Sequence, residues 1–186
     1  MTIRRVVLAA TSALVLCLAA CTSQVGGQAT PDPQSGSTPP VTTSATADPG
    51  NPFAGLSPCT VLDQALAGQG FPKAQPMVAD TKNSCRSSKP TSGDTPGVDV
   101  GLSFQAGQGY KDNVGNPSQA SEGQVNGRPA VEEREPLNAK GQCDVWLEVK
   151  PKSRAFVLLA SGSDTARACQ LVGDVAAKVE PLLPKN

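Results

Sequence analysis

The stretch QCDVWLEVKPKSRAFVLLAS, residues 142–161, contains two strand patterns on either side of a short turn. In the first pattern, apolar and polar side chains alternate over residues 143–150. Such alternation places every second side chain on the same face of a sheet and is typical of a half-buried strand. The turn PKSR is followed by AFVLLAS at 155–161, a more continuous apolar run. We therefore predict that the two strands form a hairpin.

Further strand patterns precede this hairpin. Residues 98–105 repeat the alternation, with Val98, Val100, Leu102 and Phe104 on one side. Weaker patterns run through 84–88 and 123–132. Together with the hairpin, these segments predict about five strands.

Two helices are expected on either side of the strands. VLDQALAG, residues 61–68, has apolar residues at helical spacing, and Thr60 with Asp63 matches the S/T-x-x-D/E capping pattern. The second helix begins after Ser163–Asp164, and Pro181 and Pro184 are expected to end it. Its apolar stripe consists of Cys169, Val172, Val175, Ala176, Val179 and Leu183.

A run of strands between two helices predicts an α+β fold. We expect an antiparallel sheet of about five strands, with an N-terminal and a C-terminal helix packed on one face. Residues 53–186 are sufficient for one such domain.

The segment 1–20 has the features of a secretory signal: Arg4 and Arg5, then an apolar core, then small residues. The apolar core is too short to span a membrane. The small residues lead directly into Cys21, as in a bacterial lipobox, where the thiol is acylated and becomes the new N-terminus. A plain secretory signal with a chance cysteine is the alternative. Cys17 would leave with the signal in either case.

Residues 21–52 consist of Cys21 and a stretch rich in Pro, Ser, Thr, Gly and Ala. Such a composition buries too little apolar surface to offset chain entropy, so we predict a disordered linker. A flexible linker of this length spans roughly 30 Å, enough to hold a domain away from a membrane.

Four cysteines remain in the domain, and an even number in an exported domain predicts two disulfides. The predicted hairpin and the helix after it bring Cys143 close to Cys169, and Cys59 can meet Cys85 in the same way. We prefer the pairs Cys59–Cys85 and Cys143–Cys169. The pairs Cys59–Cys169 and Cys85–Cys143 are the rival.

Composition narrows the range of functions. The chain has no histidine, which excludes nucleophiles activated by histidine and the commonest metal ligand. Sixteen basic and sixteen acidic side chains give no net charge, and neither a basic stripe nor a stacking surface of aromatics is present, so no nucleic-acid partner is expected. The acidic residues Glu132, Glu133 and Glu135 fit a solvated charge run better than a catalytic pair. We predict no catalytic residue, no metal and no cofactor.

Trp146 is the one candidate for a contact surface. It lies on the polar side of its predicted strand, between Asp144 and Glu148. An aromatic side chain on an outward face can mark a binding surface. The alternative is that Trp146 packs beneath the long loop at 105–123, since aromatic side chains are readily buried.

Five segments occur together in the order SPCTVLDQALAGQG, SCRSS, VNGRPAVEE, QCDVWLEV and TARACQLVGDVAAKVEPLLP. With these segments, the chain resembles a family of actinobacterial lipoproteins that share a domain of unknown function with four cysteines. The resemblance covers about residues 55–184, and Ser87 stands where members of the family often carry Trp. It implies an exported, anchored α+β protein, without an activity or functional residues.

We therefore expect a lipoprotein at the extracytoplasmic face of the cell membrane, anchored by lipid on Cys21. Its expected role is non-catalytic binding of an envelope protein or ligand that the sequence does not identify. The alternatives are a carrier of an apolar envelope ligand and a hydrolase without histidine.

Overall fold

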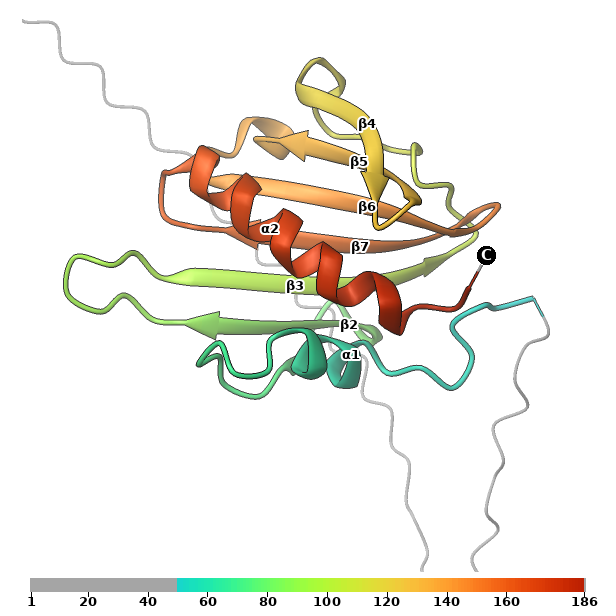
Figure 1. Cartoon of the computed structure of the whole chain (residues 1–186), viewed down its shortest axis with the longest axis horizontal. Helices are drawn as coiled ribbons and strands as arrows, with labels where there is room; N and C mark the ends of the chain where they lie inside the picture. The colour runs from blue at the N-terminus through green and yellow to red at the C-terminus, as the bar shows by residue number, and fades with distance from the viewer. Residues whose placement is uncertain (1–49, 186) are drawn as a thin grey trace, which may run out of the picture. The chain divides into compact units, whose positions relative to one another are not determined.

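The computed structural model of the chain describes residues 50–185, so the predicted signal peptide, Cys21 and the linker as far as residue 49 lie outside it. The described residues contain one seven-stranded antiparallel sheet, in which the strands are ordered β1-β2-β3-β7-β6-β5-β4 (Figure 1).

The elements have the following bounds. The helices are α1 (Pro58–Ala65) and α2 (Thr165–Val179), with short 3-10 turns η1 (Pro117–Gln119), η2 (Pro136–Asn138) and η3 (Glu180–Leu182). The strands are β1 (Gln75–Met77), β2 (Asp80–Lys89), β3 (Val98–Ala106), β4 (Ala120–Val125), β5 (Arg128–Arg134), β6 (Gln142–Lys150) and β7 (Ser153–Ala160).

The predicted hairpin of residues 142–161 is the β6–β7 pair, in which Val145 lies opposite Val157. On its other edge β7 pairs with β3, where Val157 lies opposite Leu102. The β3–β7 pair joins the first three strands of the chain to the last four. Each row of side chains across the sheet therefore combines residues that are distant in sequence.

Both helices lie against the same face of the sheet (Figure 1). The apolar positions of the alternating strands point toward these helices, and the polar positions point to the opposite face. The core between the helices and the sheet includes completely buried Leu62, Leu102, Leu147, Val157 and Val172. We call this side of the sheet the helix face.

Two disulfides tie the helices to the sheet. Cys59 in α1 is bonded to Cys85 in β2, and Cys143 in β6 is bonded to Cys169 in α2. The prediction of two disulfides is confirmed, and the pairs are those preferred from the sequence.

The helix starts depend on side-chain caps. Ser57 Oγ accepts a hydrogen bond from the Thr60 backbone N–H, so Ser57 caps α1 in place of the expected Thr60. Asp63 instead accepts a hydrogen bond from the Ala74 backbone N–H and holds the chain after the helix. Asp164 caps α2 by accepting from the Arg167 backbone N–H.

The predicted fold class is wrong. The described chain is mostly β, with seven strands where about five were predicted. The predicted N-terminal helix is not supported: the first helix among residues 50–185 is α1, which has only eight residues and begins at Pro58. The additional strands were missed because β1 has only three residues and because the weak segment 123–132 is two strands, β4 and β5.

Within residues 50–185, the structure contains no helix with the length and apolar character needed to cross a membrane.

Candidate functional site

A groove lies beside α2. It has a volume of about 540 Å³, within the range of small-molecule binding sites. We call it the α2 groove. The segment after α1, the ends of β2, β3 and β7, and one side of α2 form its walls. Its lining residues are Gln69, Phe71, Lys89, Val98, Leu159, Arg167, Leu171, Asp174, Val175, Ala177 and Lys178.

The floor of the α2 groove is apolar. Val98 and Leu159 come from β3 and β7, and Val175 comes from α2; at most 7% of each residue is exposed. Phe71 and Leu171 are half-buried and form the apolar walls above this floor. The groove is therefore an opening into the main core, where an apolar ligand would gain contacts and lose contact with water.

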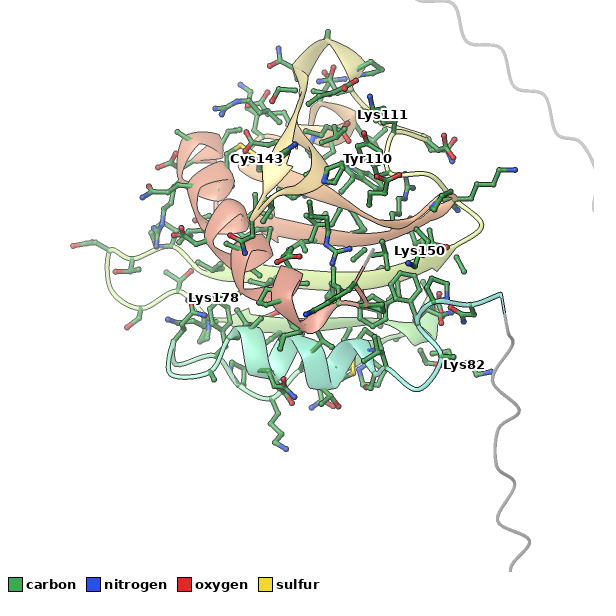
Figure 2. All side chains as sticks on the ribbon, turned by 45° about the vertical axis from the view of Figure 1, so that its right-hand side comes forward. Lys82, Tyr110, Lys111, Cys143, Lys150 and Lys178 are labelled. Carbon is green, nitrogen blue, oxygen red and sulfur yellow. A yellow bond between two sulfur atoms is a disulfide. The ribbon has the colours of Figure 1, made fainter. Side chains whose placement is uncertain are left out.

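Charged side chains surround this floor. Lys89 is held in place, because its Nζ donates a hydrogen bond of 3.0 Å to the Gln69 carbonyl oxygen. The same Nζ lies 5.1 Å from the centre of the Phe71 ring, a cation–π contact. Arg167, Asp174 and Lys178 come from α2 (Lys178 is labelled in Figure 2). Three cations and one carboxylate thus line the groove.

The helical repeat explains how α2 serves both the core and the groove. Arg167, Leu171, Asp174 and Lys178 are separated by three or four residues and therefore lie along one side of the helix. The adjacent stripe, which includes Cys169, Val172 and Val179, packs on the sheet. The same amphipathic pattern that predicted α2 therefore also supplies one wall of the groove.

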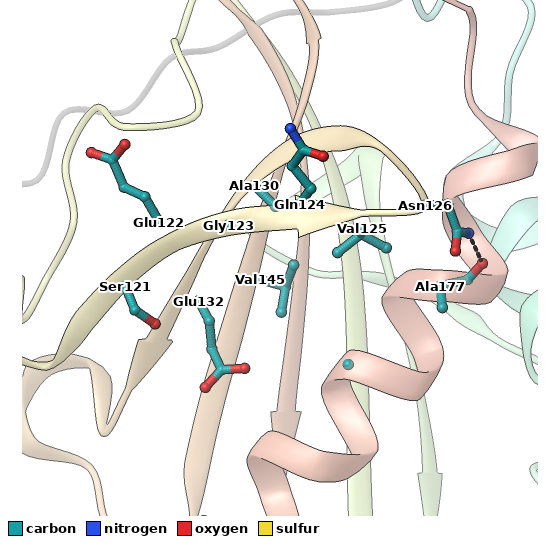
Figure 3. A pocket seen from close by; sticks show the side chains of 11 residues that line it. Ser121, Glu122, Gly123, Gln124, Val125, Asn126, Ala130, Glu132, Val145 and Ala177 are labelled. Carbon is teal, nitrogen blue, oxygen red and sulfur yellow. Dashed lines mark hydrogen bonds between the residues drawn. The ribbon is translucent and has the colours of Figure 1, made fainter.

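A second cavity, of about 420 Å³, lies between β4 and α2 on the other side of the helix (Figure 3). Small side chains line much of it, including Gly123, Gly173 and Ala130. A hydrogen bond of 2.9 Å from Asn126 Nδ2 to the Ala177 carbonyl oxygen closes one end. Because its β4 wall is a largely exposed edge strand, this cavity is a weaker candidate than the α2 groove.

Glu132 in this second cavity lies close to the sulfurs of Cys143 and Cys169, with ligand atoms within 4.8 Å of one another. The spacing is compatible with a metal ion, but the two sulfurs are bonded to each other in a disulfide. Thiolates, not disulfide sulfurs, are metal ligands. The cluster in its present form is therefore a structural disulfide beside a carboxylate.

Trp146 is buried, which corrects its interpretation as an exposed contact surface. Only 7% of the residue is exposed, and its ring stacks on Phe156 with a centroid distance of 4.1 Å. The Arg154 guanidinium lies 3.8 Å from the centre of the Trp146 ring. The alternative, in which Trp146 packs beneath the loop at 105–123, matches the structure.

Arg154 fixes this loop over the sheet face opposite the helices. Its guanidinium donates hydrogen bonds to the carbonyl oxygens of Gly109 and Asp112 and to the side chains of Gln105 and Gln108. Tyr110 and Lys111 lie on the same loop (Figure 2). The loop therefore covers Trp146 through a stacked arginine.

Two buried carboxyl groups lie beside Trp146, at directly opposite positions of β5 and β6. Glu133 is completely buried and Asp144 is 2% exposed. We call them the acid pair. Glu133 Oε1 accepts a hydrogen bond from the Asn116 backbone N–H, whereas Glu133 Oε2 and Asp144 Oδ1 have no partner among the described residues. The interpretation of 132–135 as a solvated charge run is wrong for Glu133, because strand alternation turns it to the covered face.

Burial and the neighbouring Glu133 carboxylate raise the pKa of Asp144 to about 8. Asp144 is therefore protonated at neutral pH, which removes the repulsion of two adjacent negative charges. Neither member of the acid pair lines a cavity described above, so we interpret the pair as part of the interior.

The sequence interpretation singled out Trp146 and missed the residues of the α2 groove. Lys89, Arg167 and Lys178 are separated by up to about ninety residues and meet only through the β3–β7 pairing and the position of α2. The one sequence signal was the helical spacing of the charged residues Arg167, Asp174 and Lys178 beside the apolar stripe. Cys21 lies outside the described residues.

Comparisons with known proteins give one family. Residues 16–182 match the family described as a protein of unknown function, DUF3558. No match was found among curated proteins or among solved structures. The chain belongs to the DUF3558 family, whose function is unknown.

Proposed function

We propose that this protein is an exported actinobacterial lipoprotein, anchored to the extracytoplasmic face of the cell membrane by lipid on Cys21. We further propose that its folded domain is a non-catalytic binding module. The lipobox-like sequence before Cys21 and the linker to residue 52 support the anchoring. The two disulfides also support it, because disulfides persist in oxidising compartments outside the cytoplasm.

The α2 groove is the observation that carries the binding role. Pockets that bind small molecules are mostly apolar, with a few polar groups that orient the ligand. The groove has this composition, since Val98, Leu159 and Val175 form the floor and charged residues surround it. The histidine-free composition supports binding over catalysis.

Substitution of Cys21 tests the anchoring. We expect the Cys21→Ala variant to be released into the medium, because it lacks the thiol that would carry lipid. Cys17→Ala is the matched control, since Cys17 lies within the predicted signal peptide and is expected to leave with it. Unchanged membrane association of Cys21→Ala would count against the proposal, as would equal release of the two variants.

Photo-crosslinking in intact cell envelopes tests the binding role. A photoreactive amino acid replaces half-buried Leu171 in the groove, and in the control it replaces Val78, which is 97% exposed in the turn between β1 and β2. We expect a defined adduct, detected by mass spectrometry, at position 171 and not at position 78. The same adducts at both positions, or none at 171, would contradict a binding role for the groove.

A further inference from the structure

We propose that the α2 groove binds one free amphiphile with an apolar chain and a single anionic head group, and that Lys89 and Arg167 hold the head group. This inference rests on the proposed binding function and adds the chemical class of the ligand.

The topology places Lys89 and Arg167 at the same end of the sheet. Lys89 lies opposite Val98 in the β2–β3 pair, and Val100 lies opposite Leu159 in the β3–β7 pair. The chain leaves β7 at this end and turns into α2, whose first turn carries Arg167. Both cations therefore line the groove toward the end of the sheet at which β2 ends, Lys89 from β2 and Arg167 from α2.

The other end of the groove is electrically balanced. Asp174 and Lys178 are four residues apart on α2, so they are neighbours on its surface. Eleven residues of helix separate Arg167 from Lys178, which corresponds to roughly 16 Å. Asp174 lies one turn from Lys178 and two turns from Arg167, so its negative charge offsets the positive charge of Lys178 more than that of Arg167.

Both cations have hydrogen-bond donors available for a ligand. A lysine ammonium has three donors, and Lys89 uses one of them on the Gln69 carbonyl oxygen. Arg167 is half-buried, and no side-chain hydrogen bond or ion pair joins its guanidinium to another described residue. A half-buried guanidinium without a protein partner, above an apolar floor, suits a carboxylate, sulfonate or phosphate group.

The volume and the walls favour a free small molecule over a membrane surface. A groove of about 540 Å³ has room for a ligand of drug-like size. Its floor lies among core residues such as Val98 and Leu159, which a flat bilayer surface cannot reach. The apolar chain of the ligand would lie along this floor, between Phe71 and Leu171.

Isothermal titration calorimetry with dodecanoate tests the proposal. The full chain carrying Cys21→Ala is used because it has no acyl group of its own, and dodecanoate is kept below its micelle-forming concentration. We expect saturable binding of one dodecanoate per chain. Dodecan-1-ol has the same chain without the charge, and we expect it to bind at least about tenfold more weakly, because charge-assisted hydrogen bonds are lost.

Two variants of α2 locate the head group. Arg167→Gln and Lys178→Gln each remove one positive charge from the groove. We expect Arg167→Gln to weaken dodecanoate binding about tenfold or more and Lys178→Gln to change it by less than about twofold. Circular dichroism confirms that each variant is folded. Leu171→Asp is a further variant, which places a carboxylate in the wall and is expected to abolish dodecanoate binding.

The results separate the ligand class from the binding role. Equal affinities for dodecanoate and dodecan-1-ol, or equal losses in the two α2 variants, overturn the head-group site. No dodecanoate binding together with a crosslinked adduct at position 171 overturns the ligand class and leaves the binding role intact. If both are absent, both proposals fail. If the protein binds phosphatidylglycerol vesicles but not free dodecanoate, Lys89 and Arg167 contact a membrane surface. That result also overturns the proposal of a free amphiphile.

Discussion

The acid pair shows how the position of a residue in a strand pair determines its burial and its protonation state. Glu133 and Asp144 lie opposite each other on the face covered by the loop at 107–116, and both are almost completely buried. Two adjacent carboxylates cannot both be charged in such a place without a large cost in free energy. The raised pKa of Asp144, about 8, keeps that side chain neutral near pH 7.

This pKa predicts that stability decreases as pH rises. Between the ordinary value of 3.8 and about 8, the folded domain holds a proton on Asp144 that the unfolded chain has lost. The free energy of unfolding therefore falls by up to about 1.4 kcal/mol per pH unit in this range because of this group. The Asp144→Asn variant has no titrating group at this position. We therefore expect the free energy of unfolding of the variant, relative to that of the original chain, to increase from pH 5 to pH 8.

Urea denaturation at several pH values measures this effect. The control is Asp94→Asn, a substitution of an exposed aspartate in the loop between β2 and β3, which should leave the pH profile parallel to that of the original chain. A stability difference for Asp144→Asn that is independent of pH would show that Asp144 is charged in the fold.

Arg128 is a second buried polar residue, and it holds the C-terminal segment on the sheet. Only 5% of it is exposed. Its guanidinium pairs with Glu180 at 3.0 Å and donates hydrogen bonds to the carbonyl oxygens of Glu148 and Pro184. One side chain thus joins β5, β6 and the chain that follows α2.

We expect Arg128→Met to lower the free energy of unfolding by about 3–5 kcal/mol, because it leaves Glu180 and two carbonyl oxygens without this partner. Lys111→Met breaks the exposed ion pair between Lys111 and Glu122 and should have no measurable effect. Thermal denaturation compares the two variants. Equal losses would mean that the Arg128 contacts do not stabilise the fold.

Among the elements, the long regular ones could be predicted from the sequence and the short polar ones could not. The alternation of apolar residues identified β3, β6 and β7, and the helical stripe identified α2. The exposed strand β4 has no apolar alternation because one of its faces has little to pack on. The turn Asn126–Gly127 was the available signal, since both residues have positive φ and Asn-Gly is typical of a tight hairpin.

Gly141, just before β6, lies very close to Gly162, just before α2, and a substitution can test this contact. Gly141 has φ +76°, and an added Cβ would lie 2.0 Å from the Gly162 carbonyl oxygen. We expect Gly141→Ala to lower the free energy of unfolding by at least about 2 kcal/mol, since the backbone must move. Gly173 lies within α2, and an added Cβ would have no atom within 4 Å.

Gly173→Ala is therefore the matched control and should raise the free energy of unfolding by about 0.5–1 kcal/mol through helix propensity. Chemical denaturation of both variants checks the signs. A stabilising Gly141→Ala would contradict the close approach of the 141 and 162 backbones.

At the scale of the whole molecule, the α2 groove could not be predicted from the sequence because its walls come from distant segments. Lys89 comes from β2, Leu159 from β7 and Arg167 from α2, and no sequence period connects them. Their proximity depends on the strand order, which local patterns do not specify. The pair Cys143–Cys169 was accessible because it joins a helix stripe to a strand face identified by periodicity, and Cys59–Cys85 was preferred because Cys59 lies at the start of the first predicted helix and Cys85 in the first strand.

The two disulfides allow a test of how α2 is held. Each closes a loop with the same sequence separation of 26 residues, so loop entropy predicts similar losses of about 2–4 kcal/mol when either is removed. We expect Cys143→Ala with Cys169→Ala to increase hydrogen exchange in α2, and Cys59→Ala with Cys85→Ala to increase it in α1. Hydrogen exchange with mass spectrometry locates the change. Increased exchange in the same helix for both double variants would contradict this assignment.

Under the proposed export, the β3–β7 pair also limits the order in which the chain can fold as it leaves the membrane. A chain that crosses a membrane N-terminus first presents Cys59 and Cys85 early, so their disulfide can form while later residues are still in transit. One edge of β3, however, has no partner until residues 153–160 have emerged. A translocation intermediate halted before that point would carry an open strand edge, which is a substrate for chaperones and proteases of the envelope. If the protein is exported as proposed, this sheet can therefore be completed only late in translocation.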